Sequence, residues 1–393
     1  MRVHRTLIGF FVALVLCHSV VIAQYKYTPP EKLSDGIRVG TLEDAGLDEA
    51  KITAATEEIL KGTYPNIHSL LIFRKGRLVY ENYFTGEDRE RGVGPLGMVK
   101  HTRGTLHDMR SVTKTVVALA VLHAATKGKI KSLDEPIFDI FPEYKRHADG
   151  DKKNITIRHL LTMSAGLEWD EKISYTDPKN SEYRMDDAPD PIGFVLQQKL
   201  VSPPGTAFNY SGGLTQILAE IVKRKTGLPV DEYTGKNIFA PLGISAFKWV
   251  KINNTWPSAA SGLRLRSRDM AKIGLLVMNN GKWNGKRIIS PSLIAEATRK
   301  HFDLKDDFND KLISNGYGYQ MWHDGYRVGG RPVNVIYFSG NGGQVLSIDR
   351  ENDIMTVVTA GNYNRRGLKH ASWEIYPDLV FPAIIEPKAN AAK

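Results

Sequence analysis

A long apolar segment that begins at Ser111 constrains the fold of this chain more than any other feature. Its apolar residues follow helical spacing and cover most sides of the helix: Val112, Val116, Leu119, Ala120 and Leu122. Such a helix is stable only when other elements surround it, so we expect it to be central and to end at Gly128. The chain is 42% hydrophobic, which is enough for a sizeable core around this helix.

The first turn of this helix carries Ser111-Val112-Thr113-Lys114. Residues three apart share a helix face, so we expect the Lys114 amine beside the Ser111 hydroxyl. Free N–H groups and the positive end of the helix dipole stabilise developing negative charge at the helix start. A buried lysine with a lowered pKa can accept the serine proton near neutral pH. The pattern therefore predicts Ser111 as a nucleophile and Lys114 as its partner.

The S-x-x-K spacing is weak by itself, because average residue usage gives about one or two matches by chance in a chain of this length. Ser245 and Lys248 form a second match, but this match follows a turn-like Pro-Leu-Gly and no long apolar helix continues from it. We interpret Ser245 as a loop residue. For Ser111, the alternative to catalysis is a simple helix N-cap with Lys114 in solvent.

Two later segments carry further candidate groups. Residues 203–212 form a turn-rich loop with Tyr210 near its end. A tyrosine hydroxyl there can relay protons beside a lysine, and the alternative is a ring that packs on the core. Residues 339–344, with the sequence SGNGGQ, allow a substrate backbone to approach closely. The N–H of Gln344 can then join that of Ser111 in an oxyanion hole, and the alternative is an ordinary hairpin turn.

Strand patterns lie at both ends of the chain, and helix patterns lie between them. We expect strands at 69–73, 78–84, 334–338, 344–348 and 354–359, helices at 48–60, 192–199, 214–225 and 373–380, and a loop at 86–105. The patterns predict an α+β fold with one sheet built from about 42–110 and 255–385. A mostly helical region, about 130–250, is inserted between these parts.

The order of S-x-x-K, tyrosine and a Gly-rich strand edge resembles the serine β-lactamase and penicillin-binding protein superfamily. It resembles most the class C β-lactamase-related branch, which includes esterases and 6-aminohexanoate-oligomer hydrolases. Further similar stretches are 133–136, 155–162, 164–167, 204–205, 260–271 and 281–291. The resemblance spans roughly 42–385. It implies an α/β sandwich of the β-lactamase/transpeptidase type, with an antiparallel sheet flanked by helices.

The resemblance also assigns roles. It implies that Ser111 is acylated, that Lys114 is its partner, and that Tyr210 is the tyrosine of the Tyr-x-Asn motif. It implies an oxyanion hole formed by Ser111 and Gln344. The substrate-binding positions that it implies are Asn341, Gly342, Gly343, Gly212 and, in a covering loop at 175–178, Tyr175.

Two positions depart from the family pattern. Gly212 stands where many members have an asparagine that contacts a substrate amide. Asn341 stands where lysine or histidine is usual, and a cation there would bind the carboxylate of a β-lactam. Both changes argue against efficient penicillin hydrolysis and leave the acyl-transfer groups in place.

Residues 1–23 have the order of a secretory signal peptide: the positive residues Arg2 and Arg5, an apolar run at 7–16, and a cleavage position before Gln24. A membrane anchor is the alternative, but a span needs ~20 apolar residues. A lipoprotein signal is less consistent, because bulky Leu16 precedes Cys17. We therefore expect export to the periplasm or medium and a mature domain at 24–393. Cleavage would remove Cys17, the single cysteine.

The remaining composition excludes several partners and cofactors. The net charge is +10, but no long basic block or nucleic-acid motif is present, so we expect no nucleic acid. The histidines are scattered along the chain, at His101, His107, His147, His159 and His323, and no two of them have the spacing of a metal-ligand motif. We therefore expect no metal and no cofactor. No later segment is apolar enough to span a membrane, so we expect no stable membrane insertion after cleavage. The oligomeric state is left open.

These observations predict a serine hydrolase that cleaves an ester or amide of a small molecule through a Ser111 acyl-enzyme. Lys114 and Tyr210 would share the acid and base work, in an order left open here. The alternatives are a β-lactamase or D-alanyl-D-alanine peptidase of the cell envelope and, in another class, a non-catalytic ligand-binding or sensor protein.

Overall fold

The computed structural model describes residues 25–304, 312–365 and 367–385. The signal peptide predicted at 1–23 lies outside the described residues. Within the described ranges, no helix combines the length and the apolar character needed to cross a membrane.

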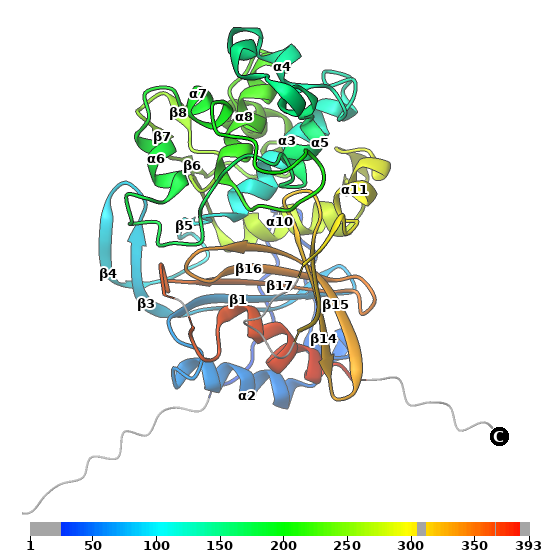
Figure 1. The fold of residues 1–393 in the computed structure, drawn as a ribbon. Coiled ribbons are helices and arrows are strands. Elements are labelled where there is room, and N and C mark those ends of the chain that lie inside the picture. Colours follow the sequence, from blue (N-terminus) through cyan, green and yellow to red (C-terminus); the bar gives the residue numbers. More distant parts are fainter. Residues whose placement is uncertain (1–24, 305–311, 366, 386–393) are drawn as a thin grey trace, which may run out of the picture.

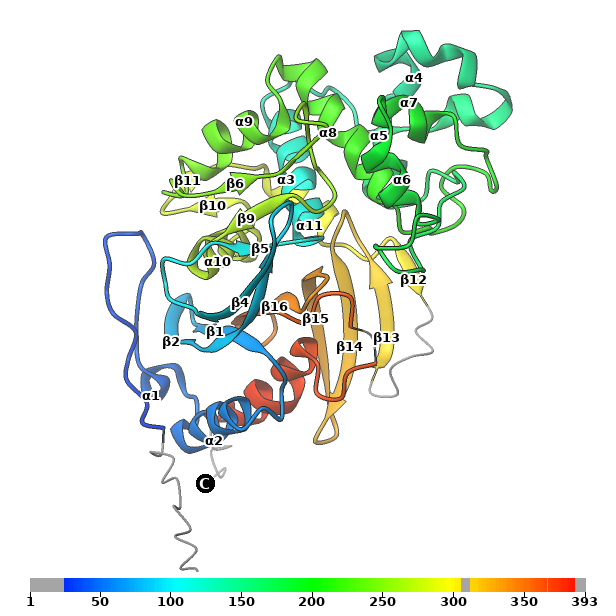
Figure 2. The same cartoon turned by 90° about the vertical axis from the view of Figure 1, so that its left-hand side faces the viewer.

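An antiparallel sheet joins the two ends of the chain. In the described residues it has eight strands in the order β12-β13-β14-β15-β16-β17-β1-β2 (Figures 1 and 2). Their bounds are β1 (Ile67–Arg74), β2 (Arg77–Tyr83), β12 (Phe302–Leu304), β13 (Leu312–Tyr317), β14 (Trp322–Val328), β15 (Arg331–Gly340), β16 (Gln344–Asp349) and β17 (Ile354–Ala360). Strand β1 pairs with β17, with Leu70 opposite Val358. The prediction of one sheet built from both chain ends is confirmed.

Shorter ladders lie beside this sheet. They are β3 (Thr85–Glu90) with β4 (Gly94–Lys100), β5 (His107–Asp108) and β6 (Lys248–Trp249) with β9 (Leu263–Leu265), β7 (Lys251–Ile252) with β8 (Trp256–Pro257), and β10 (Lys282–Trp283) with β11 (Lys286–Arg287). Pairing of β5 with β9 continues into a hydrogen bond from Met109 N to the Leu263 carbonyl at 2.9 Å. This contact fixes the chain just before the apolar helix.

The helices gather mainly in the middle of the sequence. They are α1 (Leu42–Ala45), α2 (Glu49–Leu60), α3 (Val112–Thr126), α4 (Ile137–Ile140), α5 (Ile157–Leu161), α6 (Ser181–Asp187), α7 (Pro191–Leu196), α8 (Gly212–Thr226), α9 (Val230–Thr234), α10 (Ser267–Met278) and α11 (Pro291–Ala297). Short turns η1 (Pro142–His147), η2 (Gly150–Asn154), η3 (Gly235–Phe239), η4 (Ser372–Glu374), η5 (Tyr376–Val380) and η6 (Phe381–Ala383) complete the elements. Helix α3 is buried from Val112 to Ala124 and packs on α8, so its predicted central place is confirmed.

The sheet has a covered face on each side. Helix α10 packs on β16 and β17, between the sheet and the helical region that holds α3 and α8 (Figure 1). Helix α2 and the C-terminal turns lie beneath the opposite face (Figure 1). The buried apolar side chains accordingly form two clusters, a large one shared with the helical region and a smaller one under α2.

One prediction of local structure is wrong. Residues 86–105, predicted as loop, contain the hairpin of β3 and β4, in which many side chains are exposed and no apolar alternation marks the strands. The helix predicted at 373–380 is present in irregular form, because η4 is a 3-10 helix and η5 a π-helix.

Candidate active site

Ser111 and Lys114 lie together at the start of α3. Ser111 occupies the N-cap, and its hydroxyl makes no capping hydrogen bond. The Lys114 ammonium donates to Ser111 Oγ at 3.2 Å and to the Ala260 carbonyl at 3.1 Å. Lys114 is only 1% exposed, so the alternative of an N-cap beside a solvated lysine is wrong. At the second S-x-x-K match, by contrast, both Ser245 and Lys248 are exposed.

The turn before Ser111 brings it to the edge of the sheet. Arg110 adopts a left-handed conformation with φ of 48°, and α3 starts directly after it. The end of β15 lies against this turn, because a Cβ added to Gly340 would overlap the Met109 carbonyl oxygen. The Gly-rich segment and the nucleophile therefore meet in space, as the sequence motif predicts.

Tyr210 approaches the same two residues from the loop before α8. Burial raises the pKa of its hydroxyl, and the nearby Lys114 ammonium and Ser111 hydroxyl act in the opposite direction. The Lys114 Nζ atom lies 4.9 Å from the centre of the Tyr210 ring. The ring stacks on Trp322 with centroids 5.5 Å apart, so packing and hydroxyl chemistry coexist at this residue.

The charge state of Lys114 differs from the sequence prediction. Burial alone would lower its pKa, as predicted, but Tyr210, Glu182 and Glu171 outweigh burial and raise the pKa. The Glu182 Oε2 atom lies 3.5 Å from Lys114 Nζ. Lys114 is therefore an ammonium at neutral pH, and the prediction of a lowered pKa is wrong.

Glu171 and Glu182 form a buried carboxyl pair behind Lys114, which no sequence pattern indicated. Glu171 Oε2 accepts hydrogen bonds from the Trp169 indole at 2.7 Å and from Gly212 N. Glu171 Oε1 and Glu182 Oε2 are buried without a hydrogen-bond partner in the described chain, and the two carboxyl groups interact electrostatically. Burial raises the pKa of Glu171. Burial opposes ionisation of Glu182 as well, but Lys114 lowers its pKa. Glu171 thus carries the shared proton and Glu182 the charge.

The third motif is tied to its surroundings by amide contacts. Asn341 Nδ2 donates to Asn364 Oδ1 at 2.7 Å, and Asn364 N donates to Asn341 Oδ1 at 2.8 Å. The Gln344 side chain donates to the Ala360 carbonyl at 2.8 Å and accepts from Ala360 N at 3.2 Å. These contacts hold the segment in place. The role of the Gln344 N–H as the second oxyanion donor stays a prediction.

Three glycines of the predicted site stand where a side chain would not fit. Gly342 has φ of 99°, and a Cβ there would meet the Tyr363 ring at 2.5 Å. Gly343 has φ of 96°. A Cβ on Gly212 would meet Glu182 Oε2 at 2.5 Å. Gly212 is buried behind Lys114, where the missing side chain makes room for the carboxyl pair.

An open cleft of about 600 Å³ lies in front of Ser111. Tyr175, Asn341 and three arginines line it, which are Arg89, Arg91 and Arg110. The hydroxyl of Tyr175 is hydrogen-bonded to Glu171, so the predicted covering loop contacts the carboxyl pair. The position of Asn341 is neutral. The cleft carries both signs of charge, because Glu90, Glu182, Asp186 and Asp187 line it as well, and Arg91 and Arg110 are paired with Asp186 and Asp108.

A family model described as Beta-lactamase matches residues 68–373, well over half of the chain. The chain belongs to the beta-lactamase family. Membership confirms the predicted β-lactamase/transpeptidase-like fold and places the chain in the serine hydrolase superfamily.

The individual proteins that are similar to this chain share low sequence identity with it. Over 211 residues the chain is 29% identical to esterase EstB of Burkholderia gladioli, covering 51% of each. It superposes on the solved structure of EstCE1, a hydrolase with promiscuous acyltransferase activity, with a TM-score of 0.63 and 17% identity over 86% of this chain and 98% of the other. The octameric penicillin-binding protein homologue from Pyrococcus abyssi gives a TM-score of 0.60 and 20% identity over 84% and 77%. The chain spans about half the length of the curated relatives it matches, and the structural matches show the fold alone.

The interpretation of the histidines as scattered is wrong for two of them. His101 and His107 pack against His68 of β1, with ring centroids 3.9 and 5.1 Å from that of His68. His159, by contrast, belongs to the capping box of α5. The cluster had no sequence signal, because His68 and His107 are 39 positions apart and meet only in the folded chain.

Proposed function

We propose that this member of the beta-lactamase family hydrolyses an ester or amide of a small molecule through an acyl-enzyme on Ser111. The observation that carries the proposal is the 3.2 Å contact between Lys114 Nζ and Ser111 Oγ inside a cleft. The buried Lys114 ammonium donates to the Ser111 hydroxyl at the start of α3. It therefore stabilises Ser111 Oγ as this atom loses its proton and becomes a nucleophile. Esterase EstB, the relative named above, supports ester substrates.

The raised pKa of Lys114 favours Tyr210 as the group that receives the serine proton. Burial raises the pKa of Tyr210, and the Lys114 ammonium opposes that rise, so the active form, with Tyr210 a phenolate and Lys114 an ammonium, is the minor form that has lost one proton. Ser111 Oγ attacks the substrate carbonyl carbon, and its proton passes to Tyr210. Tyr210 next gives this proton to the leaving oxygen or nitrogen as the acyl bond breaks. In deacylation, Tyr210 takes a proton from water, and the resulting hydroxide attacks the carbonyl carbon of the acyl group. Tyr210 then gives this proton to Ser111 Oγ as the bond between Oγ and the acyl group breaks.

Acylation of the purified protein tests this proposal. A fluorophosphonate probe and p-nitrophenyl acetate are applied to the parent chain, to Ser111→Ala and to the matched control Ser245→Ala, which removes the serine of the exposed S-x-x-K match. We expect labelling and turnover in the parent chain and the control, and neither in Ser111→Ala. Turnover that survives Ser111→Ala would refute the assignment.

A β-lactam is the second candidate substrate, because Arg89 lines the cleft and its guanidinium can bind the β-lactam carboxylate, whereas Arg91 and Arg110 are already paired with Asp186 and Asp108. Neutral Asn341 speaks against efficient hydrolysis. Nitrocefin turnover faster than ester turnover would favour a β-lactamase, and a long-lived penicillin adduct on Ser111 would favour a peptidase. Ligand binding without acylation by any ester or amide tested would favour a sensor protein.

We also propose that the chain is exported, with cleavage after Ala23. The positive start and the apolar run of residues 7–16 support export. N-terminal sequencing of protein recovered from a secreting bacterial host is the test. A mature chain that begins at Gln24 is expected, and an intact Met1 in the cytosol would contradict the proposal.

A further inference from the structure

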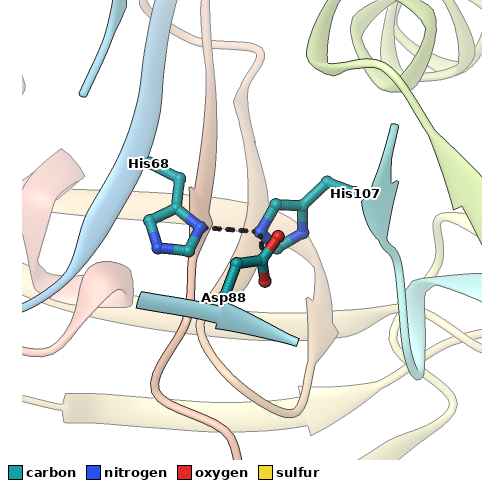
Figure 3. A group of neighbouring side chains, drawn as sticks. All are labelled: His68, Asp88 and His107. Carbon is teal, nitrogen blue, oxygen red and sulfur yellow. Dashed lines mark hydrogen bonds and ion pairs between the residues drawn. The ribbon is translucent and has the colours of Figure 1, made fainter. Parts of the chain in front are cut away.

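Two histidines and an aspartate converge in the interior beside β1, β3 and β5, outside the cleft described above. The Nδ1 atom of His68 lies 2.9 Å from Nε2 of His107, and this second atom lies 3.7 Å from Asp88 Oδ1 (Figure 3). One ligand atom from each residue lies within 4.8 Å of the other two. The three residues are 0%, 2% and 6% exposed, in the order His68, His107, Asp88. The cluster therefore belongs to the core and not to a solvated surface.

Neighbouring acceptors determine which ring nitrogens carry the protons. His68 Nε2 lies 3.2 Å from Asn66 Oδ1, and the Asn66 amide is oriented by its own bond to the Glu87 carbonyl at 2.9 Å. His107 Nδ1 lies 3.2 Å from the Asp108 carbonyl. Both partners only accept hydrogen bonds, so in neutral rings these two nitrogens hold the protons.

This assignment leaves two lone pairs that face each other. His68 Nδ1 and His107 Nε2 are then both unprotonated at their 2.9 Å contact. Two acceptors at that distance repel unless a proton or a metal ion lies between them. Ligating histidines typically donate their second ring N–H to a carbonyl or carboxamide oxygen, which is the arrangement of both rings here.

Asp88 adds a negative charge to the two imidazoles. Its Oδ1 atom accepts from Arg89 N at 2.8 Å and from the Tyr363 hydroxyl at 3.2 Å. Among the described residues, no lysine or arginine forms an ion pair with Asp88. The nearby guanidinium groups of Arg110 and Arg264 pair with Asp108 instead. A buried carboxylate of this kind is stabilised by a metal ion or a paired charge.

We propose that His68, His107 and Asp88 bind one divalent transition metal ion, with Zn²⁺ the best fit. Two imidazole nitrogens and one carboxylate oxygen are ligands that Zn²⁺ accepts, and a water can take the fourth position. Tetrahedral Zn²⁺ with Zn–N bonds of about 2.0–2.1 Å separates two nitrogen ligands by about 3.3 Å. The 2.9 Å contact between the rings therefore needs only a slight widening.

A third imidazole adjoins the site. His101 stacks on His68, is 5% exposed, and its Nε2 atom has no hydrogen-bond partner within the described ranges. A buried ring nitrogen without a hydrogen-bond partner destabilises the folded protein. A metal-bound water beside the rings would supply a donor to it.

The ion would hold three separate segments together. His68 comes from the central sheet, Asp88 from the hairpin of β3 and β4, and His107 from the short strand that leads to Ser111. Asp88 also contacts Tyr363, which lines the cleft. The site therefore stabilises the wall of the cleft and takes no part in the reaction itself.

The test uses the full chain, stripped of metal by a chelator and then titrated with Zn²⁺ against a chromophoric competitor. We expect one equivalent to bind, and a rise in Tm on its addition. Co²⁺ in place of Zn²⁺ should give the visible absorption of a four-coordinate ion. Asp88→Asn and His107→Ala should each weaken Zn²⁺ binding by at least about 100-fold and abolish the rise in Tm.

The matched control is His123→Ala, which removes a buried histidine bonded to Tyr233 outside the site. Its Zn²⁺ affinity should equal that of the parent chain. Asp88→Asn keeps the shape of the side chain, so it remains informative if His107→Ala does not fold. Absence of stoichiometric binding in the parent chain, or equal affinity in Asp88→Asn, would overturn the proposal. Neither result depends on hydrolytic activity.

Discussion

The carboxylate of Glu182 lies 3.5 Å from the ammonium of Lys114, with both side chains buried. This ion pair sets the charge of the residue that contacts the Ser111 hydroxyl. It also makes the electrostatics of the cleft depend on α6, which the sequence did not link to the site.

Glu182→Gln should move the acid limb of the pH–rate profile to lower pH. The Glu182 carboxylate raises the pKa of both Lys114 and Tyr210. Removal of its charge therefore lowers these pKa values, and the Lys114–Tyr210 pair loses its proton at a lower pH. Stability should fall by about 3 kcal/mol, because the buried ammonium loses its partner. The profile is measured as kcat against pH for p-nitrophenyl acetate. Glu58→Gln, at an exposed glutamate, is the control, and an unmoved limb in Glu182→Gln would contradict the pairing.

Lys114→Ala should reduce turnover by about 10³-fold or more and leave Arg91, 3.8 Å away, as the remaining cation beside buried Glu182. The free energy of unfolding should fall by about 3–5 kcal/mol in urea denaturation at neutral pH. Lys248→Ala, which removes the lysine of the exposed S-x-x-K match, should change neither quantity measurably. A Lys114→Ala variant with parental turnover would show that the ammonium is structural.

Tyr210→Phe should lower kcat by about 10²–10⁴-fold with little change in stability. The phenyl ring keeps the stacking on Trp322, and only the hydroxyl near Ser111 and Lys114 is lost. Steady-state kinetics and thermal unfolding are the measurements. Tyr144→Phe is the control, because it removes a hydroxyl bonded to Asp190, and neither residue lines the cleft. Equal kcat in the two variants would remove Tyr210 from the mechanism.

Gly212→Ala should destabilise the protein by about 1–3 kcal/mol. Its added Cβ would lie 2.5 Å from Glu182 Oε2 and 3.0 Å from the Ala260 Cβ atom. Gly104→Ala is the control, because the nearest atom to a Cβ there is 3.8 Å away. Both variants are compared by urea denaturation. Equal stability of the two would show that the buried carboxyl pair can move freely.

Part of the site followed from the sequence because it is local. Ser111 and Lys114 are one helical turn apart, and helix geometry alone places their side chains on one face. The order of the three motifs then indicated the family and, with it, Tyr210. The hairpin of β3 and β4 escaped prediction, because its strands are largely exposed and lack the apolar alternation by which strands are recognised.

Residue periodicity and short spacings predicted the central helix, the contact of Ser111 with Lys114, and strands at both chain ends, because each of these depends on residues close together in the sequence. The charge of Lys114, the proton held by Glu171 beside Glu182, and the contact of His68 with His107 followed only from the folded chain. These properties depend on distances between side chains from separate elements. Electrostatic energies change steeply over a few ångströms, and the sequence pattern does not encode such distances.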